Sequence, residues 1–114
     1  MTEQLLARGD RVVGTVLKPE AVADLRAQYP DTYFCRVLDV TDGAAVRAVV
    51  DDSFAEFGRI DVIVSNAGYG LFGAAEELND PQVEHIIATN LTGSIRLIRA
   101  ALPHLRAQGG GRVI

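Results

Sequence analysis

Residues 61–70 read DVIVSNAGYG, and the rest of the chain can be organised around this stretch. Val62 to Ser65 show no polar–apolar alternation, which is typical of a strand with both faces covered, as in a parallel sheet. The run ends at Asn66-Ala67-Gly68, small residues that tolerate unusual backbone angles and allow close approach to the main chain. Ligands of open α/β sheets bind outside the carboxyl ends of the strands, so we expect a ligand site at this loop.

The segments on either side alternate between strand and helix patterns. Helix patterns cover residues 2–8, 19–28, 43–57 and 81–107, and strand patterns cover 11–16, 33–38, 62–65 and 112–114. Thr41 is a plausible cap for the third helix. Asn79 or Asp80 should cap the fourth, with Pro81 at its first position. Strands that alternate with helices predict parallel pairing through right-handed crossovers, and therefore a doubly wound α/β sheet.

Composition limits the function classes. The 114 residues suffice for one small domain, and 11 Lys and Arg against 15 Asp and Glu give a net charge of −4. That balance argues against a nucleic-acid or anionic-membrane partner. One cysteine, Cys35, and two distant histidines, His85 and His104, predict neither a disulfide nor a metal site. No apolar run reaches membrane-spanning length, and residues 1–4 lack the pattern of a signal peptide, so we expect a cytoplasmic protein.

Two polar residues could serve either a ligand site or only the fold. Asp39 ends the second strand, where its carboxylate could accept a hydrogen bond from an adenine amino group. Acidic residues before a helix are, however, typical caps, and Thr41 and Asp42 are expected to act as such. Asn90 falls on the apolar side of its helix, in line with Ser94, and a buried Asn must be hydrogen-bonded. It could bond to nearby backbone in the core, or hold a water or carbonyl near a substrate.

A glycine pattern beside the opening stretch is misleading. Residues 68–73, GYGLFG, follow a strand and match the spaced glycines of dinucleotide-binding loops. That loop requires a helix at once and a strand ending in an acidic residue about 20 residues on. Residues 87–90 at that distance lie inside a helical pattern, so we reject the match.

Taken together, these motifs resemble the short-chain dehydrogenase/reductase family of the classical type. The ordered set is Asp39-Val40, Ser65-Asn66-Ala67-Gly68, Asn90-Leu91-Thr92-Gly93 and Gly111-Arg112-Val113-Ile114. The resemblance covers essentially the whole chain. It implies a partial Rossmann-like doubly wound parallel sheet over residues 1–114, part of an NAD(P)-binding domain. It also implies an oxidoreductase that interconverts a small-molecule alcohol and a carbonyl by hydride transfer.

The resemblance assigns roles to individual residues. Asp39 and Val40 match the pair that contacts the adenine ring. Asn66, Ala67 and Gly68 match the Asn-Asn-Ala-Gly motif, which stabilises the central sheet and lines the nicotinamide-ribose side. Ser65 stands where the family usually has the first of these Asn residues. Asn90 matches the catalytic Asn, which in the family holds a water that connects an active-site lysine to solvent.

The end of the first strand bears on cofactor choice. Family members that use NAD tend to carry an acidic residue there to hold the ribose hydroxyls. Here the residues are Val16-Leu17-Lys18, without an acid, which favours NADP. Lys18 would neutralise the extra phosphate, although the family's usual basic residue would fall at Leu17. Alternatively, Lys18 is a solvated loop lysine.

The resemblance also implies family features that these 114 residues do not contain. Nothing here matches the family's first strand, its glycine-rich phosphate loop or its catalytic Ser. The Tyr-x-x-x-Lys pair is also missing, because no tyrosine has a lysine four residues later. The 114 residues alone are therefore expected to be inactive. In the family's strand order 3-2-1-4-5, the first strand lies between those matched here by residues 11–16 and 62–65. Without it, we expect poor folding or a nonnative pairing of these two strands.

A second hypothesis is a truncated, catalytically inactive remnant that acts only as a binding or subunit-pairing module. The helix over residues 81–107 corresponds to an element that packs subunits together in the family. A homo-oligomer is therefore expected for the full-length protein. The substrate is not indicated by these residues.

Overall fold

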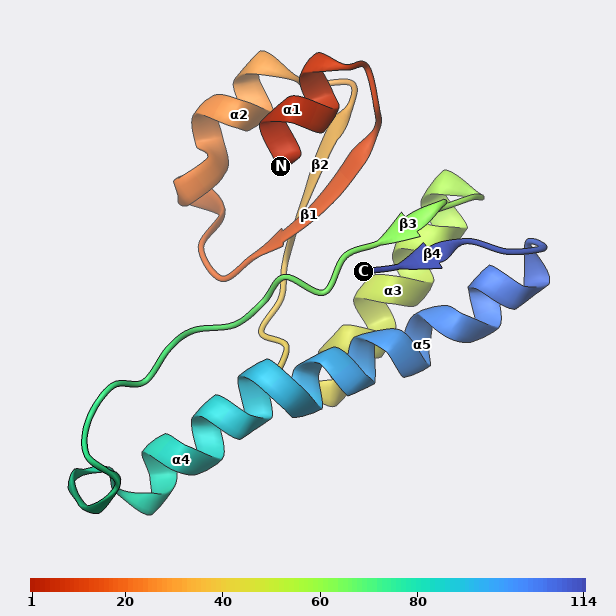
Figure 1. The fold of residues 1–114 in the computed structure, drawn as a ribbon. Coiled ribbons are helices and arrows are strands. Elements are labelled where there is room, and N and C mark those ends of the chain that lie inside the picture. The colour runs from red at the N-terminus through yellow and green to blue at the C-terminus, as the bar shows by residue number, and fades with distance from the viewer. The chain divides into compact units, whose positions relative to one another are not determined.

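The computed structural model describes all 114 residues, which form two compact units, residues 1–39 and 40–114 (Figure 1). Each unit contains several helices and one pair of parallel strands. The predicted α/β class with parallel strands is confirmed. One Rossmann-like domain over residues 1–114 stays a prediction. For the 114 residues alone, poor folding or a pairing of residues 11–16 with 62–65 was expected. In the structure β1 (Val12–Val16) pairs with β2 (Tyr33–Val37) and β3 (Val62–Ile63) with β4 (Arg112–Val113), so that pairing is absent, and poor folding stays a prediction.

The first unit has two helices and two strands around a small core. Its elements are α1 (Thr2–Ala7), β1 (Val12–Val16), a 3₁₀ turn η1 (Pro19–Val22), α2 (Ala23–Gln28) and β2 (Tyr33–Val37). β1 and β2 are parallel, with Val12 opposite Tyr33 and Val16 opposite Val37. The predicted helix over residues 19–28 is therefore a 3₁₀ turn followed by a short α-helix. Leu6 and Tyr33 are buried.

One cross-strand contact explains a glycine in β1. The Tyr33 ring lies over Gly14, where an added Cβ would stand 2.7 Å from the Tyr33 hydroxyl oxygen. Glycine weakens a strand interior, but here its missing side chain leaves room for the aromatic ring. The ring thus fills the space on this face of the strand pair.

The second unit is built on two packed helices. Its elements are α3 (Gly43–Phe57), β3 (Val62–Ile63), a 3₁₀ turn η2 (Ala75–Glu77), α4 (Asp80–Ile87), a π-helical segment η3 (Ala88–Thr92), α5 (Gly93–Ala107) and β4 (Arg112–Val113). Val50 and Phe54 of α3 pack with Ala101 and Leu105 of α5, and all four are buried. The bounds predicted for α3 are confirmed. No helix of the structure combines the length and hydropathy of a membrane span.

β3 is shorter and more exposed than predicted. Regular pairing with β4 covers only Val62 and Ile63, and one further bond runs from the Ser65 N–H to the Ile114 carbonyl at 2.8 Å. Val62 is 44% exposed, so the expectation of a strand covered on both faces over residues 62–65 is wrong here.

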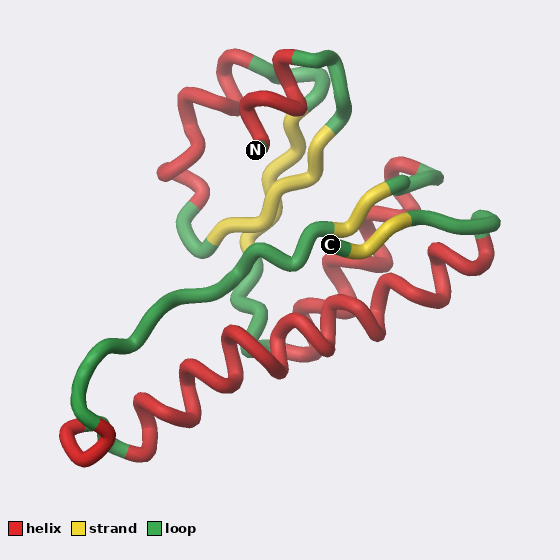
Figure 2. Tube along the Cα trace, viewed as in Figure 1, coloured by secondary structure: helices red, strands yellow, loops and turns green.

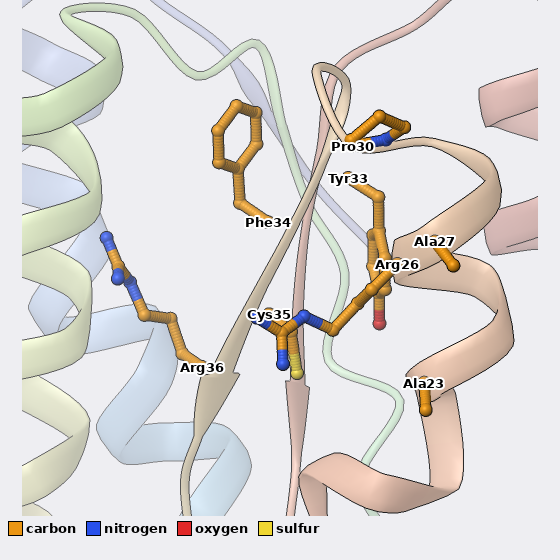
Figure 3. Close-up of a pocket in the computed structure, with 8 residues that line it drawn as sticks. All are labelled: Ala23, Arg26, Ala27, Pro30, Tyr33, Phe34, Cys35 and Arg36. Carbon is orange, nitrogen blue, oxygen red and sulfur yellow. The ribbon is translucent and has the colours of Figure 1, made fainter.

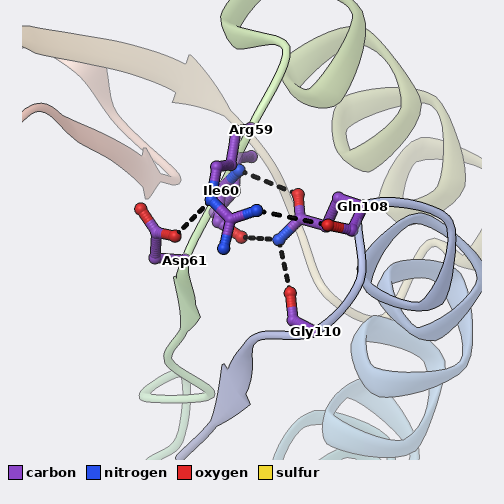
Figure 4. A network of polar contacts seen from close by, with 5 residues as sticks. All are labelled: Arg59, Ile60, Asp61, Gln108 and Gly110. Atoms are coloured by element: carbon purple, nitrogen blue, oxygen red, sulfur yellow. Dashed lines mark hydrogen bonds and ion pairs between the residues drawn. The ribbon is translucent and has the colours of Figure 1, made fainter.

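A polar network fixes the start of β3 to the end of α5 (Figure 4). The Gln108 side chain accepts from the Ile60 N–H at 3.2 Å and donates to the Ile60 carbonyl at 2.7 Å. It also donates to the Gly110 carbonyl at 2.7 Å. The Arg59 guanidinium donates to the Asp61 carboxylate at 2.6 Å and to the Gln108 carbonyl at 3.2 Å. One glutamine thereby satisfies main-chain groups of both segments that lead into the β3–β4 pair.

The helix starts show which of the expected residues act as caps. Asn79, not Asp80, caps α4: its side chain accepts from the Gln82 N–H at 3.0 Å, and Gln82 bonds back to the Asn79 N–H at 3.0 Å. Pro81 is the second residue of α4 rather than the first, because the helix begins at Asp80. At α3 the cap is Asp42, one of the two residues expected to act as caps, whereas Thr41 is not the N-cap residue. Asp42 accepts from the main-chain N–H groups of residues 44 and 45, at 2.9 and 3.0 Å.

Replacing Asp42 with alanine is expected to lower the free energy of unfolding by about 1 kcal/mol, because two N–H groups of the first turn lose their acceptor. Asp52→Ala is the matched control, with the same change of charge at an exposed position inside α3. It should leave stability unchanged or slightly raised, since alanine has the higher helix propensity. Urea unfolding of the full-length protein measures both, and equal losses would contradict Asp42 as the cap.

Candidate functional site

The side chain of Asn90 is bonded to the loop that follows β3 (Figure 2 shows the loop between β3 and α4 in green). The Tyr69 N–H donates to Asn90 Oδ1 at 3.0 Å, and Asn90 Nδ2 donates to the Tyr69 carbonyl at 2.7 Å. An added Cβ at Gly68 would stand 3.2 Å from Asn90 Oδ1. The structure therefore brings together Asn90 and Gly68, both of which the sequence pointed to. The expectation that Asn90 is buried is wrong: the residue is exposed.

Asn90 lies in a π-helical turn that the sequence pattern does not predict. α4, η3 and α5 form one continuous helix, in which the Gly93 N–H donates to the carbonyl of Ala88, five residues back. Such turns are rare in proteins, and those that occur are often found at functional sites. The apolar repeat predicts only an uninterrupted helix, because a single five-residue step barely disturbs it. The mid-helix Gly93 is the local signal that the helix is unusual here.

Gly93 allows the helix to pack closely on Val40. A Cβ at Gly93 would lie 2.8 Å from Val40 Cγ2 and 3.3 Å from the Ala88 carbonyl oxygen. A glycine inside a helix lowers the helix's stability by about 1 kcal/mol relative to alanine. The close contact with Val40, which leaves no room for a Cβ, explains why glycine stands here. Val40, a predicted adenine contact, is half-buried against this helix.

Two hydroxyl groups make a second link between the loop and the helix. Ser65 Oγ donates to Ser94 Oγ at 2.9 Å, and Ser94 Oγ donates to the Asn90 carbonyl at 3.1 Å. The sequence places Ser94 in line with Asn90 but gives no sign of its contact with Ser65. Between the two links, Asn66, Ala67 and Gly68 are exposed. A ligand can therefore reach the segment that was expected to contact the cofactor.

The glycine pattern of residues 68–73 forms no phosphate loop. These residues are irregular, and only the three-residue turn η2 precedes α4. Phe72 is 93% exposed, and the Tyr69 ring lies 5.7 Å from the His85 ring, centre to centre. The helix that such a loop requires does not begin directly after these glycines, which agrees with the reason for rejecting the match.

In the first unit, Lys18 and Asp39 each lie two residues beyond a strand. β1 ends at Val16 and β2 at Val37, and these two residues are paired in parallel register. The Leu38 N–H extends the pairing by donating to the Val16 carbonyl at 3.0 Å. Carboxyl ends of parallel strands share one edge, so Lys18 and Asp39 follow the same edge of this pair, and both are exposed.

A hollow of about 500 Å³ in the first unit involves none of the predicted site residues (Figure 3). Phe34 and Arg36 leave β2 on one side, whereas Tyr33 and Cys35 leave it on the other, near Arg26. Burial raises the pKa of the Tyr33 phenol. The neighbouring Cys35 raises this pKa further by its charge and its hydrogen bond, and Arg26 opposes the shift.

We expect the Tyr33 phenol to make stability depend on alkaline pH. Above its ordinary pKa of 10.0, the unfolded chain releases the proton while the folded chain keeps it. The unfolded state then binds fewer protons, so the free energy of unfolding falls as pH rises through the folded pKa. Tyr33→Phe should flatten this fall. The urea midpoints of the wild type and of Tyr33→Phe, at about pH 8 and above pH 10, measure this fall. An equal drop of the midpoint with pH in both proteins would contradict the role of Tyr33.

Comparison with known proteins identifies the family. A sequence model described as short chain dehydrogenase matches residues 1–114. The chain belongs to this family. The oxidoreductase BOA17 of Botryotinia fuckeliana is 35% identical over 114 residues, which are 99% of this chain and 42% of the relative. A short-chain dehydrogenase structure from Streptomyces avermitilis is 42% identical with a TM-score of 0.93, over 98% of this chain and 42% of that one. This short-chain dehydrogenase sequence thus spans less than half the length of these relatives.

Related proteins are named for both nicotinamide cofactors. The structure of ElxO with NADP bound is 27% identical, with a TM-score of 0.88, over 98% of this chain and 47% of that one. A Mycobacterium tuberculosis protein named as an uncharacterized NAD-dependent oxidoreductase is 42% identical over 76 residues, 67% of this chain and 28% of the relative. The family therefore supports a nicotinamide cofactor for this chain, and the choice between the two depends on its own residues.

Proposed function

We propose that the full-length protein is an NADP-dependent oxidoreductase that interconverts a small-molecule alcohol and a carbonyl by hydride transfer in the cytoplasm. The observation that carries this proposal is the double hydrogen bond between Asn90 and the Tyr69 main chain. It joins the helix turn that bears the proposed catalytic Asn to the small-residue loop after β3. Membership of the short-chain dehydrogenase family supports the reaction type.

Each residue that is proposed to contact the cofactor suits one part of a dinucleotide. Asn66, Ala67 and Gly68 are small and exposed, so a ribose and a flat ring can approach their main chain. The Asp39 carboxylate and the Val40 side chain offer an acceptor and an apolar contact for adenine. The Lys18 ammonium offers a charge for the phosphate that distinguishes NADP. When bound, the nicotinamide supplies the hydride chemistry, and Asn90 is proposed to hold a water for proton transfer.

The test is turnover by the full-length protein with a panel of simple ketones and aldehydes, followed by the absorbance of NADPH or NADH. We expect NADPH to be favoured by about tenfold or more in kcat/KM, the effect of one charge-assisted contact. Lys18→Ala should remove most of this preference, and Lys18→Arg should keep it. Absence of turnover with either cofactor would refute the enzyme, and equal use of both would refute the NADP preference. The 114 residues alone should show no turnover.

The alternative is a module that only pairs subunits, and one observation favours a pairing surface. Val83, Ile87, Leu91 and Ile95 recur at four-residue steps along the α4–α5 helix, and each is 39–57% exposed. Apolar residues gathered on an exposed helix often mark a protein interface. We propose that this stripe joins copies of the full-length protein. Sedimentation of the full-length protein should show an oligomer, and Leu91→Asp should shift it towards the monomer. An oligomer without enzymatic activity would favour the subunit-pairing module over the oxidoreductase.

A further inference from the structure

We propose that Ser94 and Ser65 are positioning residues that hold the segment Asn66–Gly68 in the shape that receives the cofactor. This inference rests on the proposed function, because it concerns the segment that is proposed to line the nicotinamide side. Neither serine is expected to touch the reacting atoms. Each acts through the main chain of the loop.

The geometry is a clamp at both ends of one short segment. Asn90 and Ser94 are four residues apart, a spacing that places side chains on the same helix face. Asn90 holds Tyr69 by two bonds, and Ser94 holds Ser65 by one. The segment between these two anchors is only three residues long, so its path is set by where the anchors stand.

The hydrogen bonds have a fixed direction. A serine hydroxyl has one proton to donate. Ser94 donates its proton to the Asn90 carbonyl, so it must accept the proton of Ser65. The chain therefore runs from Ser65 through Ser94 to the main chain of the π-helical turn. Removing the Ser94 hydroxyl breaks both bonds at once and releases the Ser65 anchor.

A second serine in the chain separates this role from a merely local bond. Ser53 of α3 donates to the carbonyl of Val49, four residues back, at 2.6 Å. Ser94 makes the same local bond to Asn90, but it also reaches a residue 29 positions away in sequence. Ser53→Ala therefore removes the local bond alone, and serves as the matched control for Ser94→Ala.

The kinetic test uses the full-length protein. Ser94→Ala should raise the KM for NADPH by about threefold to tenfold, the change that corresponds to one net hydrogen bond, with a smaller effect on kcat. Ser65→Ala should give a similar change, and the double variant should be no worse than either, because all three lose the same contact. Ser94→Thr keeps the hydroxyl and should restore the wild-type KM. Ser53→Ala should leave it unchanged.

A second readout does not depend on turnover. The Tyr69 N–H is bonded to Asn90, so its hydrogen exchange reports whether the clamp is closed. Exchange at Tyr69 should accelerate in Ser94→Ala but not in Ser53→Ala. If the wild-type protein turned over no substrate, the proposed function would fail while this measurement still tested the clamp. Unchanged exchange in Ser94→Ala, or an unchanged KM in an active enzyme, would overturn the inference.

Discussion

Replacing Phe54 with alanine is expected to lower the free energy of unfolding by about 3–5 kcal/mol, the range for deleting a buried aromatic ring. Phe54 is 7% exposed and packs with Val50, Ala101 and Leu105. Its ring also stacks on His104, with centroids 4.5 Å apart and planes within 9° of parallel. Alanine would leave a cavity between α3 and α5 and remove the stacking partner of His104.

The matched control is Phe72→Ala, the same substitution at a ring that is 93% exposed. It should change the free energy of unfolding by no more than about 0.5 kcal/mol. Urea unfolding of the full-length protein measures both variants, provided that the slopes against denaturant agree. A loss at Phe72 as large as that at Phe54 would show that the α3–α5 contact is not the main core of the second unit.

Replacing Asn90 with alanine is expected to lower kcat/KM of the full-length protein by about tenfold to a hundredfold, because two hydrogen bonds to the loop are lost together. Asn90→Asp has nearly the same shape but no donor. Its carboxylate would face the Tyr69 carbonyl that now accepts from Asn90 Nδ2 at 2.7 Å. We therefore expect the aspartate variant to be at least as impaired as the alanine variant.

A second asparagine distinguishes a site effect from a loss of stability. Asn79→Ala removes the cap of α4 and should lower the free energy of unfolding by about 1 kcal/mol while leaving kcat/KM unchanged. Steady-state kinetics and urea unfolding on both asparagine variants make the comparison. Wild-type kcat/KM in Asn90→Ala would contradict the role proposed for this residue.

The elements that local rules govern are the ones that sequence predicts well. α3 begins and ends where its apolar stripe and Gly58 place it, and Asn79 caps α4 as one of two expected choices. Capping and helix periodicity depend on residues within a few positions of each other. Asn90 is also predicted as a special position, because a polar residue interrupts an apolar stripe.

The features that depend on distant partners are the ones that sequence does not predict. β3 pairs with β4, some 50 residues away in the sequence, and no local pattern identifies that partner. The π-helical turn at Asn90 and the link from Ser65 to Ser94 also depend on contacts between loop and helix. No local pattern specifies which main-chain group Asn90 will hold, so Tyr69 could be found only from the structure.

The two parallel pairs differ in how much chain they close. β1 meets β2 across 21 positions, from Val12 to Tyr33, whereas β3 meets β4 across 50, from Val62 to Arg112. Each doubling of a loop adds only about 0.6 kcal/mol of closure entropy, but contacts between distant residues also slow folding. A ribosome releases Tyr33 long before Arg112. The first unit can therefore acquire its strand pair while the second is still being synthesised, so we expect the β1–β2 pair to form before the β3–β4 pair.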